Sequence, residues 1–211
     1  MKLVLASNNA KKLSELQALL SDLGLQLVAQ ASLGVPEADE PHITFIENAL
    51  AKARHAALAC GGAAMADDSG LCVDALGGAP GVISAHYAGV LDAPGAREVQ
   101  RHQQDAANNL HLLHNLQGVL DRRACFVSTL VALRHAQDPQ PLVAVGCWPG
   151  EILHTPRGEK GFGYDPLMFI PDLACSVAEL DAQTKNQHSH RARAVAQMRL
   201  LLRAWSPRRA P

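Results

Sequence analysis

The N-terminal part of the chain alternates short apolar runs with helix-like patterns, and this alternation restricts the fold more than any other feature. Residues 2–6 and 25–29 are apolar runs of strand length. Between them, leucines recur at helical spacing from Leu13 to Leu23, and Asn9 is a candidate N-cap. The pattern predicts strand, helix and strand in succession, which is typical of an α/β protein.

The rest of the chain extends this pattern. An Ala-rich helix is expected from Thr44 to Cys60, and a polar helix over residues 96–117. The runs 124–134 and 142–148 flank a Pro-containing turn and predict a hairpin. Further strands are expected at 63–66 and 71–73, with a break at Asp67–Gly70, and a last helix at 189–205. We therefore expect a mixed, elongated sheet flanked by helices.

Length and charge limit the classes of function. The chain has 211 residues, of which 48% are hydrophobic, so one large domain or two small lobes can form a core. The net charge is −1. Because general nucleic-acid binding needs a basic surface, a nucleic-acid-binding module is disfavoured. The tail, residues 206–211, is expected to be frayed.

The cysteines and the N-terminus indicate the compartment. The five cysteines are scattered and form no CxxC pair, so a disulfide framework or a zinc site is not expected. The apolar run at the N-terminus is too short for a signal peptide, and no segment is long enough to span a bilayer. We expect a cytoplasmic protein.

Two adjacent aspartates, Asp67 and Asp68, follow an apolar run. Burying such charges is costly unless a cation compensates them. Mg²⁺ suits this role because it binds one or two carboxylates together with phosphates and water. One carboxylate could instead activate water as a general base. The alternative is a simple Asp-Ser-Gly turn.

The segment from Ser7 to Lys12 lies between an expected strand and an expected helix. Free backbone N–H groups at a helix N-terminus bind phosphate, and Lys11 and Lys12 would add positive charge. The alternative is that Asn9 only caps the helix while the lysines lie in water.

Two later clusters complete the candidate site. In Gly161–Pro166, glycines allow close approach of a ligand, and Phe162 and Tyr164 offer flat faces for a base, although a turn with Phe162 in the core is the alternative. Lys185 and Ser189–Arg191 lie near the expected start of the last helix. A helix N-terminus favours bound anions, and the alternative is that these side chains are simply solvated. Together the clusters fit a nucleoside triphosphate.

Five blocks of the sequence, in order along residues 7 to 194, resemble the signatures of the inosine triphosphate pyrophosphatase family, in particular its bacterial dITP/XTP pyrophosphatases. The blocks are SNNAKKLSEL, TFIENALAKA, ADDSGLCVDALGGAPGVISAHYAG, GFGYDP and KNQHSHRARA. The resemblance implies a single domain, residues 1–211, whose two lobes flank a central cleft, and usually a homodimer. It also implies Mg²⁺-dependent hydrolysis of ITP, dITP and XTP to a nucleoside monophosphate and pyrophosphate, which removes deaminated purines from the nucleotide pool.

The resemblance assigns roles residue by residue. Asp68 matches the proton acceptor and a magnesium ligand, and an acidic residue before the second helix, Glu40 in preference to Asp39, matches the second ligand. The substrate-binding positions are Ser7, Asn8, Asn9, Ala10, Lys11, Lys12, Ser69, Phe162, Gly163, Tyr164, Asp165, Lys185, His190 and Arg191.

The chain departs from the family pattern at two places. His86 stands where the family commonly has Arg, so a fixed charge is replaced by an imidazole. Glu159 and Lys160 stand where small residues are usual, which would add charge at the mouth of the base pocket. Neither departure affects the aspartate pair.

Two rival functions remain at this stage. A pyrimidine-directed or septum-type nucleotide pyrophosphatase of similar fold would hydrolyse dUTP or dTTP instead. A nucleotide sensor would bind without hydrolysis, but a sensor has no need of a water-activating carboxylate such as Asp68.

Overall fold

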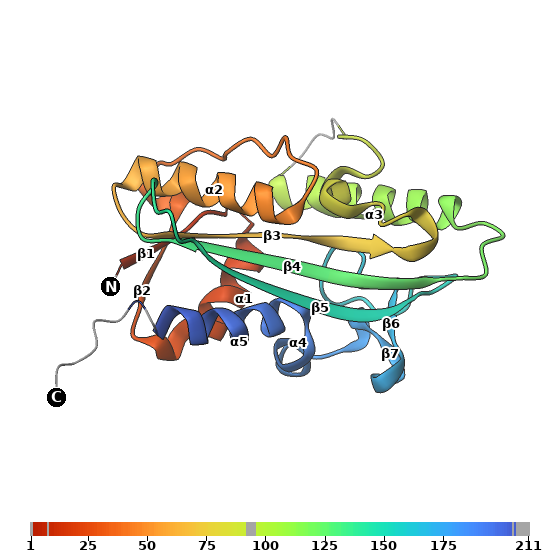
Figure 1. The fold of residues 1–211 in the computed structure, drawn as a ribbon. Helices are drawn as coiled ribbons and strands as arrows, with labels where there is room; N and C mark the ends of the chain where they lie inside the picture. Colours follow the sequence, from red (N-terminus) through yellow and green to blue (C-terminus); the bar gives the residue numbers. More distant parts are fainter. Residues whose placement is uncertain (1, 8, 92–95, 204, 206–211) are drawn as a thin grey trace. The chain divides into compact units, whose positions relative to one another are not determined.

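The computed structural model describes residues 2–7, 9–91, 96–203 and 205. Its helices and strands, labelled in Figure 1, follow one another along the chain as β1 (Lys2–Leu5), α1 (Ala10–Leu20), β2 (Gln26–Ala29), α2 (Phe45–Cys60), β3 (Ala64–Val73), α3 (Arg97–Asn115), β4 (Arg123–Leu133), β5 (Leu142–Ile152), β6 (Met168–Ile170), β7 (Cys175–Ser176), α4 (Ala182–His188) and α5 (His190–Arg203).

The strands form one mixed sheet of seven strands in the order β2-β1-β3-β4-β5-β6-β7. Strand β1 pairs in parallel with β2 and with β3, whereas β6 pairs antiparallel with β5 and with β7. The sheet with helices beside it confirms the predicted α/β class.

The chain divides into two compact units. Unit 1 comprises residues 1–68, 128–147 and 186–211, and unit 2 comprises residues 69–127 and 148–185. Strands β3, β4 and β5 therefore contribute one part to each unit. The cleft expected between two lobes stays a prediction.

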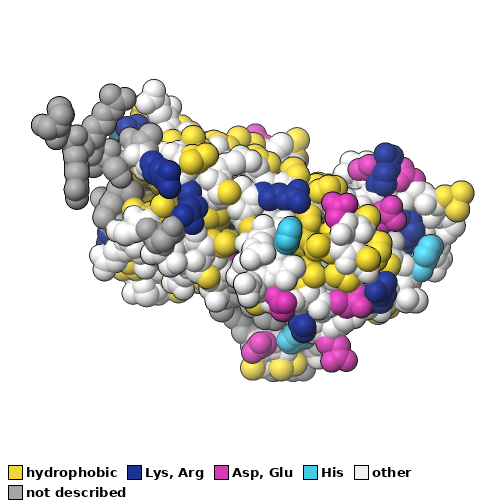
Figure 2. Space-filling view, turned by 90° about the horizontal axis from the view of Figure 1, so that it is seen from below, with side chains coloured by type: hydrophobic (Ala, Val, Ile, Leu, Met, Phe, Trp, Pro, Cys, Tyr) yellow, Lys and Arg dark blue, Asp and Glu magenta, His cyan; other side chains and the backbone are white. Residues whose placement is uncertain are grey.

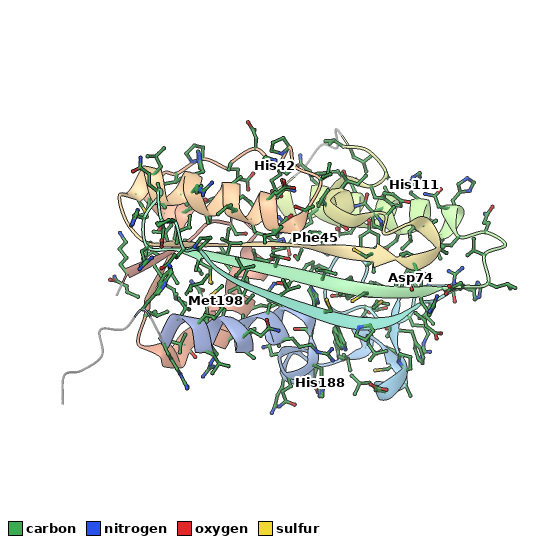
Figure 3. The ribbon with its side chains drawn as sticks, viewed as in Figure 1. His42, Phe45, Asp74, His111, His188 and Met198 are labelled. Atoms are coloured by element: carbon green, nitrogen blue, oxygen red, sulfur yellow. The ribbon has the colours of Figure 1, made fainter. Side chains whose placement is uncertain are left out.

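In unit 1 the sheet is covered on both faces, with α1 and α5 on one side and α2 on the other (Figure 1). The alternation of β1 explains this arrangement, because successive side chains of a strand point to opposite faces. Leu3 and Leu5 join the core against α1 and α5, whereas Val4 joins the core against α2. Met198 points from α5 toward the sheet and is fully buried (Figure 3).

Helix α2 is held against the sheet by small side chains. Its buried face is largely alanine, including Ala49, Ala53 and Ala56, so the helix can lie close to the strands. Thr44 caps its N-terminus by accepting a hydrogen bond from the backbone N–H of Glu47, and Gly61, with φ of 63°, ends it. The predicted bounds of this helix are confirmed.

Unit 2 has a core of its own, formed by the second part of β3, the first part of β4, the second part of β5, by β6 and by α3. Its buried side chains are Leu71, Val73, Leu112, Leu116, Ala124, Phe126, Trp148, Ile152, Tyr164, Leu167, Met168, Ile170 and Val177.

One prediction about local structure was wrong. The expected break at Asp67–Gly70 does not exist, because β3 continues from Ala64 to Val73 through both aspartates. Lys185, predicted near the start of the last helix, lies on α4, a separate short helix that immediately precedes α5. The expected frayed tail, residues 206–211, lies outside the described residues.

None of the helices in the described part of the chain combines the length and the apolar character that crossing a membrane requires.

Candidate active site

Strand β3 places two buried carboxylates next to each other. Asp67 is 3% exposed and Asp68 is 4% exposed. Because successive residues of a strand face opposite sides, the two side chains enter different surroundings. Asp67 meets residues of α1 and α5, whereas Asp68 meets a residue of α2. The sheet therefore separates two charges that a tight turn would have left side by side.

Asp67 is compensated on its side of the sheet. Its carboxylate lies 3.2 Å from the ammonium of Lys12 and 3.4 Å from the guanidinium of Arg191. The hydroxyl of Ser128 donates a hydrogen bond of 2.6 Å to Oδ1. Burial would raise the pKa of Asp67, but Lys12 and Arg191, together with Ser128, hold it well below its usual range. Asp67 is thus a fixed anion.

Arg191 is 1% exposed and contacts two carboxylates, those of Asp67 and Glu15. Gly146 on β5 allows α5 to begin close to the sheet, because a Cβ at this position would come within 1.9 Å of the carbonyl oxygen of His190. The glycine thereby brings the first residues of α5, His190 and Arg191, next to the strand.

Asp68 has a different environment on the other side. The ammonium of Lys52 lies 2.8 Å from its Oδ1 and 3.0 Å from Oε2 of Glu40. Burial raises the pKa of Asp68 to about 6, although Lys52 acts in the opposite direction. Burial also opposes ionisation of Glu40, but Lys52 keeps the pKa of Glu40 below its usual value. Two neighbouring aspartates thus have pKa values that are shifted in opposite directions.

The second oxygen of Asp68, Oδ2, is buried and has no hydrogen-bond partner among the described residues. Such an oxygen is costly to bury unless a donor or a cation meets it. Glu40 and Asp68 together offer the one or two carboxylates that Mg²⁺ takes from a protein when phosphates and water complete its coordination. Among the described residues no group of three or more acidic, histidine or cysteine side chains is placed to hold a metal. The donor set therefore fits a metal that is shared with a phosphate ligand.

The segment expected to grip phosphate lies at the start of α1. Oδ1 of Asn9 accepts a hydrogen bond of 3.2 Å from the backbone N–H of Lys12, so the predicted cap exists. Oγ of Ser7 accepts a hydrogen bond from the N–H of Asn9. Asn8 lies outside the described residues, as do the side chains of Ala10 and Lys11. Phosphate binding by this segment stays a prediction.

In unit 2, Phe162, Asp165 and Lys185 form a second cluster, called here the Phe162 cluster. Oδ2 of Asp165 accepts hydrogen bonds of 2.9 Å from the N–H of Phe162 and of 2.8 Å from the ammonium of Lys185. The same ammonium lies 4.7 Å from the centre of the Phe162 ring. Asp165 and Lys185 are 3% and 9% exposed, so a buried cation is held against an aromatic face.

The remaining predicted residues are placed as follows. Ser69 is half-buried on β3 in unit 2. The hydroxyl of Tyr164 donates a hydrogen bond of 2.8 Å to the backbone carbonyl of Ser84. His86 is exposed. The ammonium of Lys160 donates a hydrogen bond to the backbone carbonyl of Glu179. The grouping of Lys185 with His190 and Arg191 around a base stays a prediction.

Sequence reasoning missed Lys52, Glu15 and Ser128. Lys52 follows the buried Asn48 by one helical turn and lies between the buried Ala49 and Ala53. A lone cation on the apolar face of an Ala-rich helix is a signal that a charge lies opposite. Glu15 and Ser128 carry no comparable signal, since their roles arise from contacts with distant segments.

Comparison with known proteins identifies the family. The model of the Ham1 family matches residues 3–201. The chain belongs to the Ham1 family. A protein of Methylibium petroleiphilum named dITP/XTP pyrophosphatase is 68% identical over 204 residues, which are 97% of this chain and 98% of that protein. A protein of the same name from Leptothrix cholodnii is 65% identical over 97% of this chain and 99% of its own length.

A solved Ham1 protein from Coxiella burnetii has the same fold. It is 42% identical, with a TM-score of 0.86 over 97% of this chain and 99% of its own length. Figure 2 shows one face of the present chain, on which the described basic side chains lie in separate groups interspersed with acidic and hydrophobic side chains. The family resemblance inferred from the five sequence blocks is confirmed.

Proposed function

We propose that this chain is an Mg²⁺-dependent pyrophosphatase that hydrolyses ITP, dITP and XTP to the nucleoside monophosphate and pyrophosphate. Family membership and the names of the relatives support the reaction class and the substrates. The observation that carries the chemistry is the unequal pair on β3: Asp67 is a fixed anion, whereas the pKa of Asp68 is raised to about 6. Two carboxylates with separated pKa values are the arrangement expected of an acid–base site.

Asp68 takes a proton from the attacking water. The water oxygen bonds to the α-phosphorus, the bond from that phosphorus to the bridging oxygen of the β-phosphate breaks, and pyrophosphate leaves with the bond's electron pair. Without bound metal, burial raises the pKa of Asp68 to about 6, so its carboxylate is ionised at neutral pH yet more basic than an ordinary aspartate.

Glu40 and Asp68 would hold Mg²⁺, which supplies positive charge against the charge that develops on the phosphates. Lys12, the N-terminus of α1 and Lys52 bind and orient phosphate oxygens. Asp67 keeps Lys12 in place through their ion pair of 3.2 Å.

The Phe162 cluster recognises the base. The ring of Phe162 provides a stacking face, and the ammonium of Lys185 donates a hydrogen bond to the 6-keto oxygen of hypoxanthine or xanthine. Adenine carries an amino group at this position, so the buried cation would be left opposite a donor. An unmatched buried polar group of this kind costs about 5- to 150-fold in rate.

Analysis of the products tests this function. With Mg²⁺ and ITP, the protein should release IMP and pyrophosphate in equal amounts, and dUTP and dTTP should be poor substrates. IDP with phosphate as products, or binding of ITP without turnover, would contradict the proposal. The homodimer and the cytoplasmic location implied by the resemblance belong to the same proposal; light scattering of the purified protein and cell fractionation test them.

A further inference from the structure

Helix α3, drawn in yellow-green in Figure 1, carries polar side chains on two stripes that hold loops of unit 2. On the first stripe, Nε2 of Gln104 donates to the carbonyl of Gly89 over 2.7 Å, and Oε1 accepts from the N–H of Leu91 over 2.9 Å. One turn later, Asn108 donates to the carbonyls of Ser84 and Ala85. These bonds hold the loop at residues 84–91, which contains none of the base-recognition residues.

The second stripe, Asp105 and Asn109, holds a single residue of the Phe162 loop at both of its backbone polar groups. Oδ2 of Asp105 accepts a hydrogen bond of 2.8 Å from the N–H of Gly163. Nδ2 of Asn109 donates a hydrogen bond of 2.9 Å to the carbonyl of Gly163. The spacing i, i+4 places the two side chains one above the other on the helix, so they meet the same peptide segment.

Gly163 has no side chain to pack: its φ is 62°, and a Cβ built on it would meet nothing within 4 Å. Its own N–H and carbonyl are both held by side chains of α3. Gly163 lies between Phe162, whose ring meets the Lys185 ammonium, and Tyr164, whose ring belongs to the core. A shift of Gly163 would move the Phe162 ring relative to Lys185.

The side-chain amide of Asn109 carries a buried oxygen that lowers stability. Its Oδ1 is buried and has no hydrogen-bond partner among the described residues, while its Nδ2 is occupied by Gly163. Since burial of an unpartnered carbonyl oxygen lowers stability, an aliphatic residue would be the better choice if the position served packing alone. The amide is explained by the bond to Gly163.

We infer that Asp105 and Asn109 are positioning residues for base recognition, acting through the backbone of Gly163. The inference rests on the proposed function, in which the Phe162 cluster reads the base. Neither side chain is assigned a contact with the substrate. They hold the Phe162 ring at a fixed position relative to the Lys185 ammonium, so that both groups can contact the same oxo-purine base.

The experiment compares kcat and KM for ITP and for ATP in Asp105→Ala, Asp105→Asn, Asn109→Ala and two controls. Gln104→Ala removes hydrogen bonds from the first stripe of the same helix, and Gln103→Ala changes an exposed residue of that helix. Melting temperatures are measured for every variant. Asp105→Asn keeps an oxygen that can accept the N–H of Gly163, so it serves as the conservative rescue.

We expect Asp105→Ala and Asn109→Ala to raise KM for ITP by roughly fivefold to tenfold, the effect of one lost hydrogen bond, with a smaller change in kcat. The ratio of kcat/KM for ITP over ATP should fall by a similar factor. Asp105→Asn should restore most of this ratio. Gln104→Ala should lower the melting temperature at least as much while leaving the ratio at its wild-type value, and Gln103→Ala should change neither.

An unchanged ratio in both alanine variants would overturn the inference, as would an equal fall in Gln104→Ala. If Asp105→Ala does not fold, Asp105→Glu replaces it, because the added methylene displaces the carboxylate from Gly163 without loss of charge; a wild-type ratio in that variant would count against the inference. Failure of the proposed function is a separate result, since the wild-type protein would then release no pyrophosphate from ITP.

Discussion

The ammonium of Lys52 lies 2.8 Å from Oδ1 of Asp68 and 3.0 Å from Oε2 of Glu40. A single cation thus links the two carboxylates that we propose as metal ligands. Burial alone would lower the pKa of Lys52, but the carboxylates of Asp68 and Glu40 raise it by more than burial lowers it. Lys52 therefore stays charged at neutral pH. In the absence of metal, Lys52 neutralises part of the negative charge of Asp68 and Glu40, to which Mg²⁺ would bind.

We expect Lys52→Met to lower the melting temperature without metal, because Asp68 and Glu40 then repel each other. Mg²⁺ added alone, without nucleotide, should raise the melting temperature of this variant more than that of the wild type, since the ion no longer competes with the ammonium. Arg54→Met is the matched control, as Arg54 lies on the exposed side of the same helix. Equal Mg²⁺-induced shifts in Lys52→Met and wild type would show that Lys52 does not compete with the ion.

Asp68→Asn should lower kcat for ITP by about 100- to 10,000-fold, the usual contribution of a general base. Its melting temperature should not fall. Burial raises the pKa of Asp68, which means that the ionised carboxylate lowers the stability of the folded protein, and an amide removes that charge. Asp74→Asn, at an exposed aspartate in the same chain segment, is the control. A folded Asp68→Asn protein with full activity would exclude this role.

Lys185→Met should reduce the preference for ITP over ATP, because the donor to the 6-keto oxygen is lost while the aliphatic stem is kept. We expect the ratio of the two kcat/KM values to fall by about tenfold, the effect of one charge-assisted hydrogen bond. Lys2→Met, which removes an exposed ammonium from β1, is the control. If the ratio stays constant in Lys185→Met, another group reads the base.

The order of elements could be predicted from the sequence because it depends on local patterns. The strand of residues 2–6, the helix ending at Cys60 and the cap at Asn9 all follow from spacing and from residues at element ends. The predicted break at Asp67–Gly70 was wrong for a physical reason. Charged residues and glycine normally end a strand, but here Lys12, Arg191 and Lys52 compensate the charges, so the strand continues.

The partners of the site could not be predicted in the same way. Asp68 could be predicted as a candidate site residue from the sequence, but its ion-pair partner Lys52 could not, because an ion pair between a strand and a helix depends on packing and not on spacing. Likewise, Asp105 and Asn109 are polar residues on a polar helix, and nothing local distinguishes them from their solvated neighbours. Their role appears once the fold brings Gly163 against them.

Asp138, between β4 and β5, gives a pH-dependent contribution to stability. Both of its carboxylate oxygens accept hydrogen bonds from the Arg134 guanidinium, at 2.8 and 2.7 Å, and these bonds hold the pKa of Asp138 well below its usual range. A lowered folded-state pKa means that the stabilisation is complete above the unfolded pKa of about 3.9 and is lost as the pH falls below it.

We therefore expect Asp138→Asn to be less stable than wild type by a constant free energy of unfolding above about pH 5, and the difference to shrink below about pH 4. Urea denaturation between pH 2.5 and 7, values chosen as roughly spanning the unfolded pKa, measures this. Asp172→Asn, at an exposed aspartate, should show no such difference. A gap between Asp138→Asn and wild type that persists unchanged at the lowest pH would contradict the assignment.

Gly161 and Gly163 provide a matched pair on the Phe162 loop. Both have positive φ, 83° and 62°, so alanine at either position incurs the left-handed strain of about 1–2 kcal/mol. The surroundings differ: a Cβ at Gly161 would lie 2.0 Å from Oδ2 of Asp165, whereas a Cβ at Gly163 would meet nothing within 4 Å. Alanine at Gly161 must therefore displace the carboxylate that holds the Lys185 ammonium.

We expect both alanine variants to lose similar stability from backbone strain, with an additional loss in Gly161→Ala from the displaced carboxylate. Gly161→Ala should also raise KM for ITP by about tenfold, because Lys185 loses its fixed position, whereas Gly163→Ala keeps both backbone groups that α3 holds and should keep KM within about twofold of wild type. Thermal unfolding and steady-state kinetics of the two variants measure these effects side by side. Equal KM values in the two variants would mean that Asp165 does not set the position of the base-reading cation.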